Sequence, residues 1–244
     1  GGEVSRDAEE MGYVIGVEAH NEVAKFKNGK FELGLGTKYD SEFIVDSGSE
    51  NVSYVSTLPI YASAKASFKA AAGVNVYVQG LLGYVIPFEA DGTKGNDLEG
   101  GAYYGLGFGA DTEYKDNQKV GLAFFYTNGN VDVNNMSQNA DLDVFTTLVY
   151  GNVPVIDDKT NFLYQAGYSW QNTQTDRGIF TGETAESKYT SKTASLDLRV
   201  MRDVNVNKDL LLQPLVNTTY RHFTNPAYNE TGAGALNLNV DKFK

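Results

Sequence analysis

The chain of 244 residues has no cysteine, one tryptophan, two histidines and five prolines. Without cysteine it can form neither a disulfide framework nor a thiolate metal site. No run of about 18 apolar residues occurs, so no transmembrane helix is expected. No basic stretch leads into an apolar segment, so no signal peptide is expected either. The 20 basic and 31 acidic residues give a net charge of −11, which opposes binding to nucleic acid.

Glycine and aromatic residues are plentiful, with 26 Gly, 16 Tyr and 13 Phe. Apolar residues alternate with polar residues or glycine over long stretches. In one such stretch Phe31, Leu33 and Leu35 share a face, and Glu32 and Gly34 share the other. The same alternation runs through residues 58–69, 102–115 and 161–171. A period of two indicates β-strands, and no segment has a convincing helical period.

After a polar N-terminal segment at residues 1–11, the alternation predicts eleven strands. They lie near residues 12–22, 29–43, 58–70, 74–88, 102–115, 118–128, 141–155, 160–172, 190–204, 208–223 and 235–243.

The connections between these strands alternate between short and long. The long ones are rich in Gly, Asn, Asp, Ser and Thr, as loops are, and run over 44–57, 89–101, 129–140, 173–189 and 224–234. Short turns on one rim and long loops on the other are typical of barrels in the bacterial outer membrane. Most strands also have the 9–11 residues or more that a tilted strand needs to cross the hydrocarbon layer.

We therefore expect an all-β, antiparallel, up-and-down transmembrane β-barrel in the cell outer membrane. Its apolar face should point to lipid and its polar face should enclose the lumen. The stretch Gly105-Leu106-Gly107-Phe108-Gly109 places three glycines on the inner face of one strand. Glycine there eases the coiling of neighbouring strands and leaves room for an inward aromatic side chain from the next strand.

Charged and polar side chains on the inner face are the candidate functional residues. Residues of both signs on facing strands favour either a lumen filled by salt bridges or a polar channel. The residues expected to face the lumen are Glu18, His20, Lys38, Lys65, Asp111, Glu113, Gln165, Asp197 and Arg199.

Catalytic motifs are not evident. The two histidines, His20 and His222, are both placed on the polar face, and His222 beside Arg221 is the better candidate for catalysis. A catalytic histidine needs an acid or a nucleophile at a fixed distance, which the sequence does not show. The alternating glycines at 105–109 do not match the dinucleotide-binding fingerprint. We expect no enzyme activity, no cofactor and no metal site.

From about residue 76 to 244 the sequence resembles the translocator, or β-domain, of autotransporter proteins. The resemblance is carried by Tyr77-Val78-Gln79-Gly80-Leu81-Leu82-Gly83-Tyr84, by 104–111, by 119–126, by Arg177, by Gln213-Pro214-Leu215, by Glu230-Thr231-Gly232-Ala233 and by 235–240. It implies a twelve-stranded barrel that helps to export an upstream passenger domain. The implied partners are outer-membrane lipid and lipopolysaccharide, the barrel assembly machinery and the passenger, with the barrel itself a monomer.

The N-terminal third is more similar to generic small outer-membrane barrels of the OmpA or OmpW type, through Leu58-Pro59-Ile60-Tyr61 and Phe68. A small passive pore or a scaffold for surface adhesion is therefore the alternative function. A soluble barrel that binds a small ligand is a further one. Because the eleven strands leave an odd count, we expect residues 12–244 to form a barrel clipped at one or both ends, with an incomplete sheet or an irregular seam.

Overall fold

A computed structural model of the chain describes residues 12–46, 52–71, 73–90, 100–115, 118–133, 138–207 and 210–242. The polar segment 1–11 lies outside the described residues, as do parts of the expected loops at 44–57, 89–101 and 129–140.

Long antiparallel strands make up nearly all of the described structure. Their bounds are β1 Gly12–Phe26, β2 Gly29–Asp46, β3 Val52–Ala71, β4 Val74–Ala90, β5 Gly101–Lys115, β6 Gln118–Val133, β7 Gln138–Pro154, β8 Thr160–Gly178, β9 Thr184–Arg202, β10 Val204–Asn205, β11 Leu211–Thr224, β12 Tyr228–Asn229 and β13 Asn239–Val240, with one 3₁₀ turn, η1, at Gly234–Leu236.

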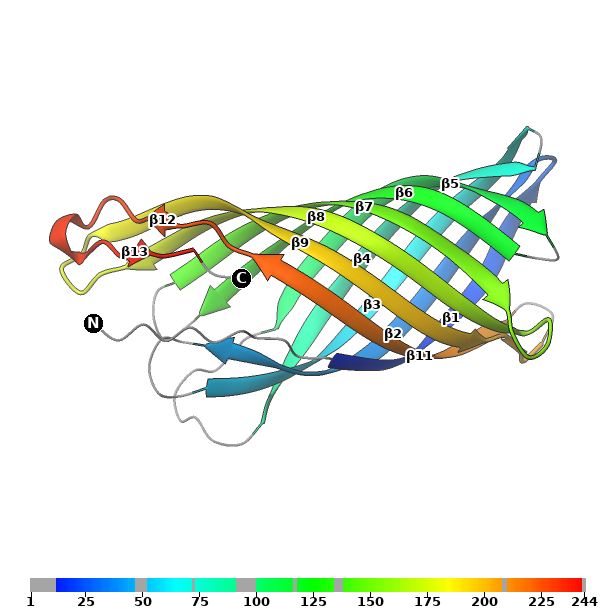
Figure 1. Cartoon of the computed structure of the whole chain (residues 1–244), viewed down its shortest axis with the longest axis horizontal. Coiled ribbons are helices and arrows are strands. Elements are labelled where there is room, and N and C mark those ends of the chain that lie inside the picture. Colours follow the sequence, from blue (N-terminus) through cyan, green and yellow to red (C-terminus); the bar gives the residue numbers. More distant parts are fainter. Residues whose placement is uncertain are drawn as a thin grey trace.

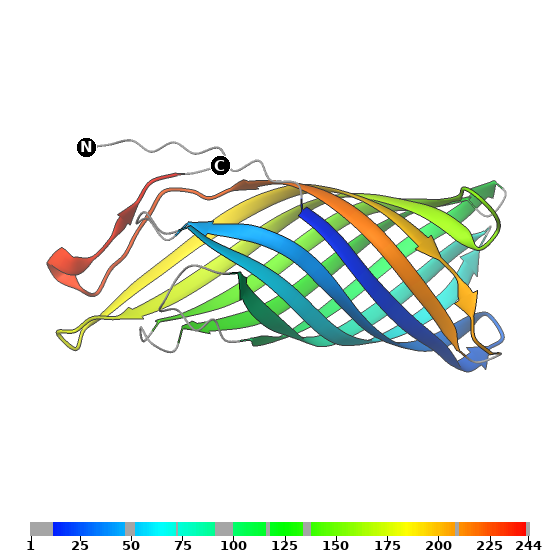
Figure 2. The same ribbon diagram turned by 90° about the horizontal axis from the view of Figure 1, so that it is seen from below.

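Eleven of these strands form one sheet, in the order β1 to β9, β11 and β10, and β1 also pairs with β11. The hydrogen bonds therefore run around a closed ring, which Figures 1 and 2 show as a tilted barrel. Among the described residues ten strands, β1 to β9 and β11, complete the ring, and β10 is a two-residue strand beside β11. The expected all-β, antiparallel barrel is confirmed.

The expectation of an incomplete sheet or an irregular seam is wrong. Strand β1 pairs with β11 from Gly12↔Thr219 to His20↔Leu211 without a register shift. Closure at this seam satisfies the backbone groups of both edge strands, which lipid could not do. Gly12, the first residue of β1, and its partner Thr219 lie toward the end of the barrel that carries the long hairpins, and β11 continues in that direction to Thr224.

The eleventh strand, expected at 235–243, is also not part of the barrel. After β11 the chain leaves the ring and runs alongside the far end of β9, as Figure 1 shows in orange and red. There β12 and β13 pair only with each other, and Thr231 makes an isolated antiparallel bridge with Glu186 of β9. We call residues 225–240 the C-terminal arm.

The long loop expected at 173–189 is mostly strand. Strands β8 and β9 stay paired without a register shift out to Gly178↔Thr184, and a tight turn with Gly182 at φ 90° joins them. Each of these strands has 19 residues, about twice the length that crossing a membrane requires. The β8–β9 hairpin therefore extends well beyond the membrane-crossing part of the barrel.

The outer face carries the large exposed apolar side chains, and its apolar belt ends in an aromatic row. Tyr126, Phe145 and Trp170 lie in register on β6, β7 and β8. Further along the same face the residues are polar, with Asn128 donating to Asp143 at 3.0 Å. An aromatic row between apolar and polar bands is the pattern found where a barrel leaves the membrane.

Among the described residues, the structure contains no helix of the length and apolarity needed to cross a bilayer.

Candidate functional site: the barrel lumen

Strand alternation places the nine expected lumen residues on the face opposite the exposed apolar side chains. On β9, Leu196 and Val200 are exposed outward, so Asp197 and Arg199 point inward. On β5, Leu106 and Phe108 are 61% exposed, and the intervening odd-numbered positions face the interior. The remaining expected residues follow the same alternation on β1, β2, β3, β5 and β8: Glu18, His20, Lys38, Lys65, Asp111, Glu113 and Gln165.

Aromatic rings lie flat against the inner wall because glycines on neighbouring strands make room for them. A Cβ built on Gly107 would stand 2.2 Å from Cδ1 of Phe125, and one on Gly109 would stand 2.6 Å from Cζ of Tyr77. A residue with a Cβ at either glycine would force the ring to shift. The same arrangement joins Tyr61 to Gly36, Tyr103 to Gly83 and Tyr150 to Gly121.

The inward carboxylates accept hydrogen bonds mainly from neutral donors. Asp197 accepts bonds from Gln165 at 3.1 Å, from Asn217 at 3.2 Å and from Thr219 at 2.5 Å. Asp111 accepts bonds from Asn75 at 3.0 Å and from Tyr150 at 3.2 Å. Neutral donors satisfy buried carboxylates without burying a second charge.

Three further interactions in the lumen involve charged groups. Lys30 donates to Glu32 of the same strand at 2.7 Å. Glu18 accepts a hydrogen bond from the hydroxyl of Tyr61 and pairs with Nε2 of His20 at 3.3 Å. The ammonium group of Lys65 lies 4.2 Å from the ring centre of Tyr77, in a cation–π contact. Among the described residues, the lumen therefore combines ion pairs at Glu18 and Glu32 with carboxylates that are bound by neutral donors.

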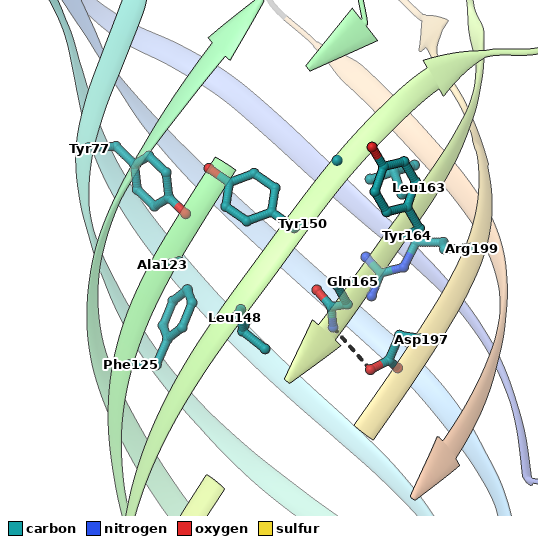
Figure 3. A pocket seen from close by; sticks show the side chains of 11 residues that line it. Tyr77, Ala123, Phe125, Leu148, Tyr150, Leu163, Tyr164, Gln165, Asp197 and Arg199 are labelled. Carbon is teal, nitrogen blue, oxygen red and sulfur yellow. Dashed lines mark hydrogen bonds between the residues drawn. The ribbon is translucent and has the colours of Figure 1, made fainter. Parts of the chain in front are cut away.

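A cavity of about 160 Å³ opens between β4, β6, β7, β8 and β9. Figure 3 shows Tyr77, Tyr150, Phe125 and Leu148 on one side of it and Gln165, Asp197 and Arg199 on the other. Asp197 is bound by Gln165, as the dashed line marks. Among the described residues, the guanidinium group of Arg199 makes no hydrogen bond or ion pair.

The placement of His222 on the polar face is wrong. In β11 Leu215, Asn217 and Thr219 are buried, whereas Val216 and Tyr220 are exposed, so His222 shares the outer face with the latter pair. Near the end of β11 both faces carry polar residues, so the sequence alternation does not show which face points inward. No group of three or more histidine or acidic residues that could hold a metal occurs within the described ranges.

A second polar cluster lies outside the membrane, where the C-terminal arm meets the β8–β9 hairpin. Arg177 donates from Nε to Glu230 at 3.0 Å and from Nη2 at 2.5 Å, and also reaches the carbonyl oxygen of Leu236 at 3.1 Å. The backbone N–H of Leu238 donates to the same carboxylate at 2.8 Å. The hydrogen bonds from Arg177 hold the pKa of Glu230 below its ordinary value.

The remaining contacts of the arm bury small and polar side chains. Tyr228 stacks on Tyr189 with ring centres 4.1 Å apart, and Ser191 donates to Asn225 at 2.5 Å. Burial raises the pKa of Tyr228 to about 12. Ala185 and Ala233 are 0% and 2% exposed. Arg177 and Glu230, two residues on which the family resemblance depends, thus meet in space although 53 positions separate them.

Sequence reasoning missed the inward tyrosines. Tyr61, Tyr103 and Tyr150 line the interior, yet a tyrosine counts as apolar or polar with equal ease in an alternation pattern. The signal that could have found them is glycine on a neighbouring strand at the register position opposite, as with Tyr61↔Gly36 and Tyr103↔Gly83.

A closed ring of strands with apolar side chains outside and charges inside defines the class of this protein: it is a transmembrane β-barrel. Residues 76–244 match the family described as the autotransporter β-domain. The match covers more than half of the chain, so the protein belongs to that family and resides in the outer membrane. A search by sequence among curated proteins found no relative.

Solved structures with a similar arrangement have very low sequence identity to this chain. The toluene transporter TodX of Pseudomonas putida is 7% identical, with 89% of this chain and 90% of that chain covered and a TM-score of 0.34. An outer membrane channel from Pseudomonas putida F1 is 10% identical over 90% and 97%, with a TM-score of 0.36. LpxR from Salmonella typhimurium is 6% identical over 85% and 99%, with a TM-score of 0.32. Scores this low support no inference about function.

Proposed function

We propose that this barrel anchors an autotransporter in the outer membrane and helps to export its passenger domain. The observation that carries the proposal is the match of residues 76–244 to the autotransporter β-domain. The distribution of side chains supports it, because the apolar exterior of the barrel is stable only in lipid and its polar interior suits a hydrated path.

The position of β1 supports the proposal further. Gly12 pairs with Thr219 at the end of the barrel that bears the long β8–β9 hairpin. With the long hairpins outside the cell, as is usual for outer-membrane barrels, a segment attached before Gly12 emerges on the outer side. A passenger attached there must cross the membrane to reach that side.

The inner wall suits passage of an extended chain. Rings such as Phe125 lie flat over Gly107, and the carboxylates of Asp111 and Asp197 are occupied by neutral donors. These two carboxylates would therefore present little unpaired negative charge to an extended peptide.

We also propose the partners that accompany this role. Outer-membrane lipid would contact the apolar belt, and lipopolysaccharide would contact the polar outer face beyond Trp170. The barrel assembly machinery would insert the barrel, which would act as a monomer without catalytic activity.

Export is tested with an epitope-tagged reporter fused before Gly12 in intact Gram-negative cells. A second epitope in the β8–β9 turn, beside the 92% exposed Phe180, reports correct insertion. We expect external protease to remove both tags. A reporter that stays protected while the turn epitope is cleaved would contradict the export function and leave the barrel assignment intact.

The polar lumen face favours a second candidate, a passive pore. Ten strands enclose a narrow interior, since barrels of about eight strands are filled by their own side chains. Conductance in planar bilayers separates the two functions: the export proposal predicts small, unstable currents, and a stable open channel would favour the pore.

A further inference from the structure

We propose that the lumen cavity beside Arg199 binds a small aromatic carboxylate. This inference is independent of the export function, because it depends only on the cavity, its lining side chains and their charges.

The volume of the cavity fits one aromatic ring. It measures about 160 Å³, and an apolar protein cavity of about 150 Å³ is known to take up benzene. A single six-membered ring with one small substituent therefore matches the space.

The apolar wall fits the faces of such a ring. Phe125 and Leu148 line the cavity beside Tyr77 and Tyr150, whose own rings meet edge to face with centres 6.4 Å apart. The ring of Phe125 packs directly against Gly107 of the neighbouring strand. Aromatic side chains held in this way contribute both apolar contact and ring–ring interactions.

The opposite wall selects an anion. Asp197 already accepts three hydrogen bonds from neutral donors, and Asp111 accepts two, so a cation would have to displace them. The guanidinium group of Arg199, by contrast, has no hydrogen-bond partner among the described residues. A longer-range attraction links it to Glu18, which is bound by Tyr61 and His20.

Carboxylate is the anion that best fits a free guanidinium group. The two oxygens of a carboxylate accept the two parallel N–H bonds of an arginine fork. A ring seated between Phe125 and Leu148 would direct a carboxylate on its edge toward Arg199, across the cavity shown in Figure 3. Gln165 lies on the same wall, but its side-chain amide already donates to Asp197.

The test uses the detergent-solubilised barrel and benzoate as the probe, with calorimetry or saturation-transfer NMR as the readout. We expect saturable binding of one benzoate, and at least about tenfold weaker binding of benzyl alcohol and benzylamine, which lack the anion. Arg199→Gln should weaken benzoate binding by about tenfold or more, and Arg199→Lys should have an intermediate effect because it keeps the charge but loses the fork.

The matched control is Arg202→Gln. Arg202 lies three positions further along β9, where it donates to Thr160 and pairs with Asp157 at 3.1 Å, away from the cavity. The Arg202→Gln variant should leave benzoate binding unchanged. Leu148→Phe should abolish binding by filling the cavity. Equal binding of benzoate and benzylamine, non-saturable uptake, or unchanged affinity in folded Arg199→Gln would overturn the proposal.

Discussion

At five places inside the barrel an aromatic ring rests on a glycine of the neighbouring strand. The contact needs a residue without a Cβ, since even alanine at Gly107 would overlap the ring of Phe125. The sequence did predict that Gly105, Gly107 and Gly109 share the inner face and leave room for an inward aromatic side chain. Gly107 and Gly109 receive the rings of Phe125 and Tyr77, whereas Gly105 faces Thr127. Which ring each glycine receives could not be predicted, because that depends on the register between strands.

Gly107→Ala should destabilise the barrel by about 1–3 kcal/mol, because the added methyl group forces Phe125 out of its position. Gly80→Ala is the matched control: it lies on the adjacent strand β4, and its nearest atom, Cδ2 of Leu106, is 3.8 Å from the added Cβ. Unfolding by urea in micelles, followed by the heat-dependent shift in gel migration, measures both variants.

Adding Phe125→Ala to Gly107→Ala should recover part of that loss, because the overlap then disappears. Fully additive effects of the two substitutions would show that the ring and the glycine do not interact.

At the scale of the element, the β8–β9 hairpin and the C-terminal arm depart most from what the sequence predicts. Residues 173–189 were expected to form a loop because both faces of that segment are polar, which hides the alternation. The strands continue there through pairs such as Thr175 with Ser187 at 2.7 Å and Asn172 with Thr190 at 2.8 Å. The arm was mistaken for a barrel strand because 235–240 does alternate, although the strand that closes the ring is β11.

The arm should release from the hairpin at acid pH. The hydrogen bonds from Arg177 lower the pKa of Glu230 from an ordinary value of 4.5. The stability that the Arg177–Glu230 pair adds to the docked arm is therefore complete above pH 4.5, and it is lost as the pH falls through the pKa of Glu230 in the folded protein. Hydrogen exchange of the Leu238 amide, which donates to Glu230, should accelerate as the pH falls through that range, beyond its intrinsic pH dependence.

Glu230→Gln should speed the same exchange by about tenfold at neutral pH and remove its pH dependence, because charge-assisted hydrogen bonds are lost. Glu183→Gln is the control, since this exposed carboxylate in the hairpin turn accepts a hydrogen bond from Thr181 of the same turn. Equal protection of the Leu238 amide in both variants would show that the ion pair does not hold the arm.

At the scale of the whole molecule, the fold class follows from the alternation and the connection lengths, and the outer-membrane assignment follows from the family match. The number of strands in the ring does not follow from the sequence. Closure depends on β1 meeting β11 in register, a contact between residues about 200 positions apart that local patterns do not encode. The same holds for the cavity, whose lining comes from five strands.

Spin-label accessibility along β9 tests the central claim, that apolar side chains face lipid and charged ones face the lumen. Because the chain has no cysteine, single cysteines can be placed from Ser195 to Val200 without background labelling. In bilayers, labels at 196, 198 and 200 should respond to oxygen dissolved in lipid, and labels at 195, 197 and 199 to a water-soluble nickel complex. The opposite alternation, or no alternation, would contradict the account.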